Sequence, residues 1–336
     1  MSTSTNTRRR LWDATEERMQ MTRVFARSAL PVAGLIVLAA CGSGPSGTVA
    51  ADGSSTVAPL TSVAAELFRA QDPSVNVTVG TSGTGGGFEK FCRGETDISD
   101  ASRPIKDVEI AACKKDSVRY TKLVVANDAL TVVVNKSNSF AKCLTTGQLK
   151  KIWEPNSTIK NWKQVDPKFP NLPLELFGPG TDSGTFDYFT EEITGRTGAS
   201  RTDYTPSEDD NVIVQGVTGS TGGLGYFGYT YFEENESKLN LVKIDSGNGC
   251  VAPSPETARD GTYTPLSRPL FVYPSINRLS SNPSLRQFLD YYVDNDAQIA
   301  KDAQYIPLSD KQRSELKKAY ADALKEAGVS SSPAAS

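Results

Sequence analysis

Hydrophobic residues recur with two periods along the chain, and together they predict an α/β fold. Leu60, Val63, Ala64, Leu67 and Phe68 follow the i, i+3, i+4, i+7, i+8 spacing of a helix that faces a core. Strands are predicted at Val75–Val79, where apolar and polar residues alternate, at Leu123–Ala126 and Leu130–Val134 with a break at Asn127–Ala129, at Leu174–Phe177 and at Leu270–Tyr273. Further helices are predicted at Thr146–Trp153, Gly184–Ile193, Asn211–Val217, Ser284–Asn295 and Ser309–Ala327, the last with Ser309 as N-cap and Gly328 as its C-terminal stop.

The amino-terminal segment has the pattern of a bacterial lipoprotein signal. A basic region precedes the apolar run Leu30–Ala40, which is too short to span a bilayer as a stable helix. The run ends in Leu38-Ala39-Ala40-Cys41, which resembles a lipobox, so we expect cleavage before Cys41 and lipidation of its thiol. An ordinary signal peptide with an incidental cysteine is the alternative. Residues 1–40 are therefore expected to be a lipoprotein signal peptide, and residues 41–48 a lipid-anchored flexible tether rich in Gly and Ser.

The remaining 296 residues exceed what one hydrophobic core usually serves, so we expect two lobes. Residues 1–40 hold six basic and three acidic residues, which leaves 30 basic and 36 acidic residues and a net charge of −6. This balance argues against non-specific binding of nucleic acid. An anion would have to be bound by local dipoles and by one or two well-placed cations. The tail at residues 329–336 is expected to be disordered.

Four cysteines remain after the signal: Cys92, Cys113, Cys143 and Cys250. An even number in an exported chain favours disulfides, and four cysteines allow three pairings. We favour Cys92–Cys113 and Cys143–Cys250, because each pair would then stay inside one lobe. Structural zinc is the alternative, although the chain has no CxxC pair and no histidine.

Four short segments are expected to be turns with exposed backbone N–H and hydroxyl donors. They are Gly53–Thr56, Thr81–Gly87, Ala101–Pro104 and Gly180–Thr185. Where such a turn opens a helix, the unpaired N–H groups and the helix dipole favour an anion. Simple helix capping is the alternative for any single turn. Four such turns in one chain indicate a pocket for a small oxyanion.

The motifs that hold these turns resemble the PstS family, the substrate-binding subunit of phosphate ABC transporters, and in particular its SphX-type branch. The resemblance runs from about Val49 to Gly328, with the motifs in the family's order. They are Gly53-Ser-Ser-Thr-Val-Ala-Pro-Leu60, Ser82-Gly-Thr-Gly85, Asp97-Ile-Ser-Asp-Ala-Ser-Arg-Pro-Ile105, Gly178-Pro-Gly-Thr-Asp-Ser-Gly-Thr-Phe-Asp-Tyr-Phe189 and Gly219-Ser-Thr-Gly-Gly-Leu-Gly-Tyr-Phe-Gly-Tyr229.

The resemblance implies a two-lobe periplasmic-binding-protein fold of the type II, "Venus flytrap" kind, with mixed central sheets and a buried ligand. The strands around Asn127 and Asp128 would form one interlobe crossing, and Thr264–Val272 the other. Residues 49–127 and 266–328 would share lobe 1, and residues 128–265 would form lobe 2. The implied function is high-affinity binding of inorganic phosphate outside the cytoplasm and its delivery to an ABC permease for import, by a monomer without a cofactor.

The family motifs also imply a set of phosphate donors, carried over position by position. The expected donors are Ser55 and Thr56 in the first turn, Ser82 in the second, and Ser183, Gly184 and Thr185 in the third, from the opposite lobe. Hydroxyl and amide donors can satisfy a tetrahedral dianion without importing full charge.

The chain departs from the better-known branch of the family at two positions. Arg103 stands where that branch has an aspartate that accepts the proton of phosphate, and Pro179 replaces an arginine that precedes the third turn. Arg103 is expected to contact phosphate in a bidentate manner and to be the most damaging single residue to remove. A surface or interlobe ion pair is the alternative for Arg103. Candidates for the missing proton acceptor are Asp182, Asp209 and Asp210, for which solvated first-turn carboxylates are the alternative.

The competing interpretation is an enzyme, namely a secreted phosphatase-like hydrolase. A third interpretation is a phosphate sensor or adhesin with the same fold. The serine turns do not fit GxSxG, and the glycine-rich stretch Gly83–Gly87 fits neither GxGxxG nor a Walker A loop. Without histidine the chain has no Ser-His-Asp triad and no imidazole metal ligand, which leaves a Ser-Lys hydrolase or an alkaline phosphatase as the enzymatic alternatives. We therefore expect no catalytic residue, no metal and no cofactor.

Overall fold

The computed structural model describes residues 47–329. The predicted signal peptide, the lipidation site Cys41, residues 41–46 of the predicted tether and the tail beyond residue 329 lie outside the described residues. The last two residues of the predicted tether, Gly47 and Thr48, belong to strand β1, so that part of the prediction is wrong. Within residues 47–329, no helix combines the length and the apolar character that crossing a membrane would require.

The strands form a mixed sheet in the order β2-β1-β3-β11-β4-β8-β6-β7, and β9 pairs with β4, β5 and β10. Strands β1, β2 and β3 are parallel, whereas β11 is antiparallel to both β3 and β4. The strands are β1 Gly47–Gly53, β2 Val75–Gly80, β3 Ile98–Ala101, β4 Leu123–Asn135, β5 Cys143–Thr145, β6 Glu175–Pro179, β7 Thr205–Ser207, β8 Gly223–Gly228, β9 Leu239–Asp245, β10 Cys250–Val251 and β11 Ser267–Pro274.

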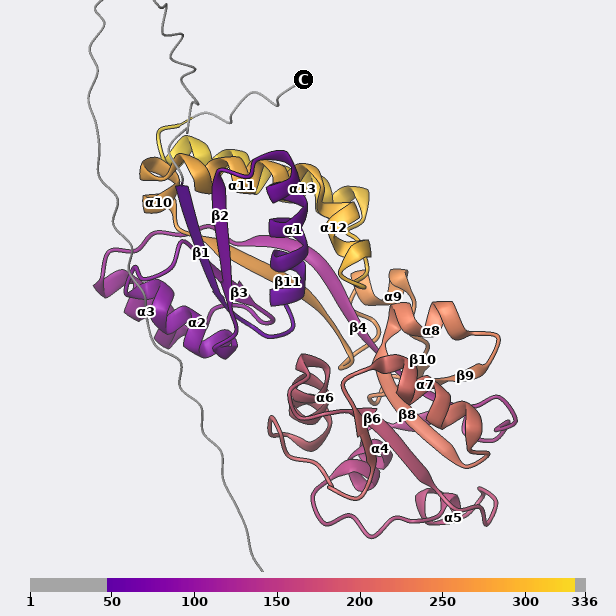
Figure 1. Ribbon diagram of the computed structural model, residues 1–336. Coiled ribbons are helices and arrows are strands. Elements are labelled where there is room, and N and C mark those ends of the chain that lie inside the picture. The colour runs from indigo at the N-terminus through magenta and orange to yellow at the C-terminus, as the bar shows by residue number, and fades with distance from the viewer. Residues whose placement is uncertain (1–46, 330–336) are drawn as a thin grey trace, which may run out of the picture. The chain divides into compact units, whose positions relative to one another are not determined.

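Two groups of helices surround this sheet, and Figure 1 shows that the first and last parts of the chain share one lobe. Lobe 1 contains β1–β3, β11, the first half of β4 and the helices α1 Ala58–Gln71, α2 Gly83–Cys92, α3 Asp107–Lys115, α10 Ile276–Ser281, α11 Pro283–Asp294, α12 Asp296–Asp302 and α13 Asp310–Glu326. Lobe 2 contains the second half of β4, β5–β10 and the helices α4 Thr146–Trp153, α5 Trp162–Val165, α6 Gly184–Thr194, α7 Asp210–Gly219, α8 Tyr229–Asn235 and α9 Pro255–Arg259.

Strand β4 passes from one lobe to the other without interruption. Its residues 123–129 pair with β11, and its residues 130–135 pair with β8 and β9. The predicted break at Asn127–Ala129 is therefore wrong. The two polar residues at the predicted break fit this buried strand because each has a partner: Asn127 exchanges amide hydrogen bonds with Gln312, and Asp128 pairs with Arg268.

Each lobe has its own hydrophobic core. In lobe 1, Leu60 and Phe68 of α1 pack with Phe288 of α11 against the sheet. In lobe 2, the rings of Phe189 and Tyr226 stack with centroids 3.8 Å apart. These separate cores let each lobe hold its own binding turns rigidly, since packed interiors deform little.

Several predicted helix limits are confirmed, because capping residues fix them. Helix α4 spans Thr146–Trp153 as predicted. Ser309 is the N-cap of α13, accepting a hydrogen bond from the Gln312 N–H at 3.2 Å. Gly328 follows that helix with φ +71°, a left-handed conformation that ends helices and that glycine adopts without strain.

Two disulfides join the four cysteines of the described chain. They are Cys92–Cys113, which links α2 to α3 in lobe 1, and Cys143–Cys250, which links β5 to β10 in lobe 2. This is the pairing favoured from the sequence, so these four thiols do not form the alternative zinc site.

Candidate functional site

A cavity of about 640 Å³ is lined by residues of both lobes. We call it the arginine cavity, after Arg103 and Arg268, which both line it. The N-terminal ends of three helices reach it through Thr56 before α1, Gly83–Gly85 at the start of α2, and Gly184 at the start of α6. Helix N-termini carry partial positive charge, so this convergence creates an environment for an anion. The other lining residues are Ser54, Ser55, Ser102, Pro104, Lys106, Asp187, Tyr188, Glu191, Glu192, Thr197, Thr264, Pro265, Ser267, Pro269 and Phe271.

The first turn, before α1, is held by its backbone. The Ser54 N–H donates to the Asp100 carbonyl at 2.9 Å, and the Thr56 N–H donates to the Ser54 hydroxyl at 3.2 Å. No side chain caps α1, whose N-cap position is the apolar Val57. The sequence-predicted donors Ser55 and Thr56 therefore lie at an uncapped helix start that opens on the cavity.

Thr56 is also a point where the two lobes touch. Its hydroxyl donates to the Gly184 carbonyl of α6 at 3.4 Å and accepts from the Arg268 guanidinium at 3.0 Å. The Tyr305 hydroxyl donates to the Thr56 carbonyl at 2.6 Å, which fixes the turn from the other side. Residues of lobe 1, lobe 2 and the crossing strand β11 thus meet at one side chain.

The second turn differs from the expectation in one respect. Ser82 does not line the cavity: its N–H donates to Asp52 at 3.0 Å, and its hydroxyl bonds to the same carboxylate. Burial acts to raise the pKa of Asp52, but hydrogen bonds from Lys90 and Ser82 outweigh it and lower that pKa. The residues that follow, Gly83 to Gly85, line the cavity instead. Ser82 therefore anchors this turn through Asp52.

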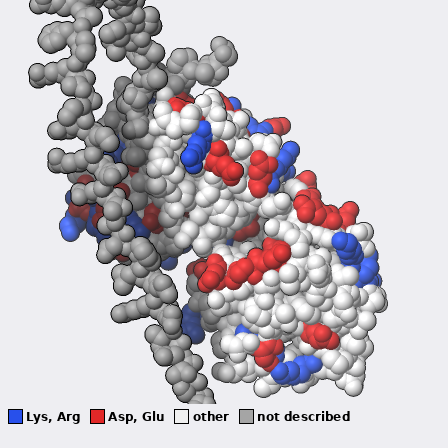
Figure 2. Space-filling view, viewed as in Figure 1, with Lys and Arg blue, Asp and Glu red and all other residues white. Residues whose placement is uncertain are grey.

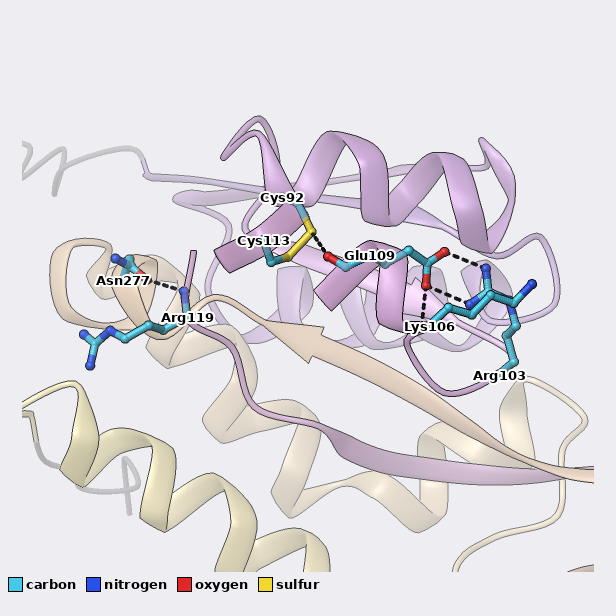
Figure 3. Close-up of a disulfide and its surroundings, with 7 residues drawn as sticks. All are labelled: Cys92, Arg103, Lys106, Glu109, Cys113, Arg119 and Asn277. Atoms are coloured by element: carbon cyan, nitrogen blue, oxygen red, sulfur yellow. Dashed lines mark hydrogen bonds and ion pairs between the residues drawn. A yellow bond between two sulfur atoms is a disulfide. The ribbon is translucent and has the colours of Figure 1, made fainter. Parts of the chain in front are cut away.

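Arg103 lines the cavity but is already paired within lobe 1, as Figure 3 shows. Its guanidinium makes two hydrogen bonds to the Glu109 carboxylate of α3, at 2.7 and 2.9 Å. The Lys106 N–H adds a third hydrogen bond to Glu109 at 2.8 Å. Burial acts to raise the pKa of Glu109, but Arg103 and Lys106 together outweigh it and lower that pKa, so the carboxylate stays ionised. Arg103 therefore takes part in a partly buried ion pair within lobe 1, whereas the alternative stated from the sequence was a surface or interlobe pair. This pair neutralises much of the Arg103 charge.

The third turn brings only one of its three predicted donors to the arginine cavity. Gly184 lines that cavity, Thr185 lines a different one, and Ser183 lines neither. Ser183 is the N-cap of α6 and accepts from the Thr185 N–H at 3.1 Å. In the structure Ser183 therefore acts as a helix cap.

Arg268 on β11 is the site residue that sequence reasoning missed. Its Nε lies 3.3 Å from a carboxylate oxygen of Asp128 on β4, and its guanidinium lies 3.5 Å from the ring centroid of Tyr188 on α6. A signal was present, because an arginine stands within Thr264–Val272, the segment expected to cross between the lobes. A charge in a buried crossing strand needs a partner or a ligand.

The three predicted carboxylate candidates do not line the arginine cavity. Asp182 is exposed, and Asp209 caps α7 by accepting from the Asn211 N–H at 2.9 Å. Asp210 lines a second cavity of about 430 Å³, where burial, Asp209 and Glu208 raise its pKa to about 7. The carboxylates that do line the arginine cavity are Asp187, Glu191 and Glu192 of α6.

Among the described residues, the lining of the second cavity has carboxylates but no Lys or Arg, and we call it the acidic cavity. Its lining contains the carboxylates Glu66, Asp128, Asp210 and Asp302, and the rings of Tyr229, Tyr231 and Tyr305. Figure 2 shows acidic side chains gathered in a row on the visible face of lobe 2. Within residues 47–329 no group of three or more Cys, Asp or Glu side chains has an arrangement that could hold a metal ion.

Comparison with known proteins identifies the fold and the family of this chain. Residues 39–296 match the model of a PBP superfamily domain. The chain is 47% identical over 288 residues to protein SphX of Synechocystis sp., covering 84% of this chain and 86% of that protein. It is 38% identical over 305 residues to the phosphate-binding protein PstS of Staphylococcus saprophyticus, covering 88% of this chain and 93% of that protein.

A solved structure agrees with these relatives. The crystal structure of a possible phosphate-binding protein from Planctomyces limnophilus superposes with a TM-score of 0.79 at 46% identity, covering 84% of this chain and all of that one. The curled mixed sheet and the two lobes thus recur in a protein of similar length and sequence. This chain therefore belongs to the SphX and PstS family of phosphate-binding proteins within the PBP superfamily.

Proposed function

We propose that this protein is an extracytoplasmic lipoprotein that binds inorganic phosphate in the arginine cavity and delivers it to an ABC permease for import. The observation that carries the proposal is the convergence of three helix N-termini and two arginines on one cavity between the lobes. The names of the relatives support the choice of phosphate among oxyanions.

In the proposed complex, phosphate is held by donors from both lobes. Ser55, Thr56 and Arg103 act from lobe 1, and Gly184 acts from lobe 2. Three further residues hold these turns in position. Ser82 does so by its hydrogen bond to Asp52, and Ser183 and Thr185 do so by the hydrogen bond between them at the start of α6. When the lobes close, the donors of lobe 1 and of lobe 2 can contact the phosphate at the same time. The ligand therefore favours the closed state, which a permease can recognise.

We further propose that Asp187 accepts the proton of bound phosphate. It lies in the first turn of α6 and lines the arginine cavity, whereas Asp182, Asp209 and Asp210 do not. Burial and Glu191 raise its pKa, while Arg268 opposes the shift. Phosphate at neutral pH can donate a hydrogen bond to a carboxylate, but sulfate cannot, so this contact would separate the two anions.

Calorimetric titration of the purified protein with phosphate, sulfate and arsenate tests this function. We expect saturable binding of phosphate and weaker binding of sulfate. Incubation with p-nitrophenyl phosphate tests the enzymatic alternative, and steady release of nitrophenol would favour a hydrolase over a binding protein. Failure of phosphate to bind or to raise the melting temperature would contradict the proposal, because a ligand that binds the native state must stabilise it.

Membrane attachment through Cys41 has its own test. Two acyl chains anchor a protein far more firmly than one, so the full chain should sediment with membranes and take up labelled palmitate. The Cys41→Ala variant should do neither. Light scattering after gel filtration tests the proposed monomer.

A further inference from the structure

Two arginines line the same cavity, but their charges are not equally available. Arg103 is matched by both oxygens of Glu109, which also accepts the Lys106 N–H. Arg268 has one contact to Asp128, made by Nε at 3.3 Å, and Nη2 donates to the neutral hydroxyl of Thr56. Among the described residues, no group accepts a hydrogen bond from its Nη1. Arg268 therefore retains donors and charge that a bound anion can use.

The surroundings of Arg268 also strengthen its interaction with an anion. Its side chain is 13% exposed, and the Asp128 side chain is 6% exposed. The Tyr188 ring covers one face of the guanidinium. Water is largely excluded from this position, so a charge-assisted hydrogen bond formed here is stronger than one at the rim.

Arg268 stands at the point where ligand binding can be coupled to lobe closure. It lies on β11, directly opposite Asp128 on β4 in the strand register. It contacts the first turn of lobe 1 through Thr56 and helix α6 of lobe 2 through Tyr188. An anion bound to this guanidinium is within reach of both lobes, whereas Arg103 and its partner Glu109 both belong to lobe 1.

We infer that Arg268 is the principal phosphate-binding cation of the arginine cavity, and that Asp128 and Tyr188 position its guanidinium so that one anion engages both lobes. This inference rests on the proposed function. It moves the main charge from Arg103, where the sequence placed it, to a residue of the crossing strand. Arg103 then has a lesser part, because its charge is already balanced by Glu109.

The test is phosphate titration calorimetry on wild type, Arg268→Gln, Arg268→Lys and, for comparison of the two arginines, Arg103→Gln. We expect Arg268→Gln to weaken phosphate binding by about 100-fold, as the loss of a buried charge-assisted partner does. We expect Arg268→Lys to weaken it by about 10-fold, since lysine keeps the charge but not the planar fork. Arg103→Gln should stay within about 10-fold of wild type.

Two further readouts separate ligand contact from a structural role. Guanidinium ion added to an Arg268→Ala variant should restore part of the phosphate affinity if Arg268 contacts the ligand. It would not restore affinity to a variant that had lost binding through misfolding. Because Arg268→Gln leaves the buried Asp128 carboxylate without its partner, the ligand-free variant should melt at a lower temperature, and phosphate affinities are compared at a temperature where every variant is folded. If Arg268→Gln does not fold, Arg268→Lys decides, and binding equal to wild type by that variant would overturn the inference. So would wild-type affinity in Arg268→Gln, or a larger loss in Arg103→Gln. Absence of phosphate binding by the wild type would instead contradict the proposed function.

Discussion

The two cavities of this protein lie on either side of one interlobe contact but differ in charge: among the described residues, the lining of the arginine cavity holds both cations and carboxylates, whereas that of the acidic cavity holds carboxylates alone. Thr56 and Gly184 line the arginine cavity, whereas Thr185, the next residue of α6, lines the acidic cavity. The acidic cavity has four carboxylates and no Lys or Arg among its lining residues. A dianion in the acidic cavity would be repelled by like charges in a partly dehydrated site. The difference shows how a chain with net negative charge can still direct an anion to one place.

The ion pair between Arg268 and Asp128 spans the division between the cavities. The arginine lines one cavity, and its partner lines the other. Burial raises the pKa of Asp128, although Arg268 opposes that shift. The same two strands that connect the lobes therefore place the arginine in one cavity and its carboxylate partner in the other. The comparison predicts that changes at the shared contact should affect binding most, and that changes inside the acidic cavity should affect stability instead.

The largest effect in this series is expected for Gly184→Ala. A Cβ atom at Gly184 would lie 2.6 Å from the Thr56 hydroxyl and 2.8 Å from the Thr56 backbone nitrogen. The lobes must then move apart at the Thr56–Gly184 contact, at a cost of about 1–3 kcal/mol for overpacking. Phosphate affinity should fall by about 5- to 150-fold in calorimetric titration.

Gly219→Ala is the matched control for that change. Gly219 ends α7, and a Cβ atom there would have no neighbour within 4 Å. This variant should bind phosphate like the wild type. Equal affinity in both variants would show that the Thr56–Gly184 contact is not part of the ligand-bound state.

A smaller effect, on selectivity, is expected for Asp187→Asn. Loss of the acceptor for the phosphate proton should weaken phosphate binding by about 10-fold, which corresponds to one hydrogen bond to a charged group. Sulfate should bind more tightly, because the amide can donate where the carboxylate repelled. Competition titration with both anions measures the ratio, with Asp182→Asn as control at an exposed carboxylate. An unchanged ratio would show that Asp187 does not contact the ligand.

Local signals in the sequence were enough to predict much of the fold. Helix α4 was predicted to its terminal residues because Thr145 and Gln148 form a capping box that fixes its start. The break in β4 was a wrong prediction, since Asn127 and Asp128 are typical of turns and their buried partners, Gln312 and Arg268, lie far away in sequence. Single-sequence patterns do not report such distant partners.

The sequence predicted which helix N-termini form the candidate site, but it did not predict the partners of the charged residues there. Ser55, Thr56 and Gly184 line the cavity because the turns that hold them open helices. The pairing of Arg103 with Glu109 has the six-residue spacing of a loop followed by one helical turn, which no simple pattern marks. The position of Arg268 depends on the register of β11 against β4, which tertiary structure sets.

The smallest effect is expected in the acidic cavity, for Asp210→Asn, and it concerns stability. Burial and the neighbouring Asp209 and Glu208 raise the pKa of Asp210 to about 7, above its ordinary value. The folded state therefore holds this proton more tightly than the unfolded state does. Ionisation of Asp210 accordingly lowers the free energy of unfolding most above pH 7, and the effect disappears at low pH, where the carboxyl is protonated in both states. A shift of this size corresponds to at most about 4 kcal/mol, and partial exposure together with the favourable helix start reduces it to about 1 kcal/mol.

Urea unfolding of Asp210→Asn and wild type at pH 4.5 and pH 8 measures this difference. The variant should be nearly as stable as wild type at pH 4.5 and about 1 kcal/mol more stable at pH 8, because the amide has no charge to bury. Phosphate affinity should not change, since Asp210 lines the acidic cavity and not the arginine cavity. A gain in stability that is equal at both pH values would mean that the charge of Asp210 is not the cause. A marked loss of phosphate affinity would mean that the two cavities do not act separately, and the comparison between them would fail.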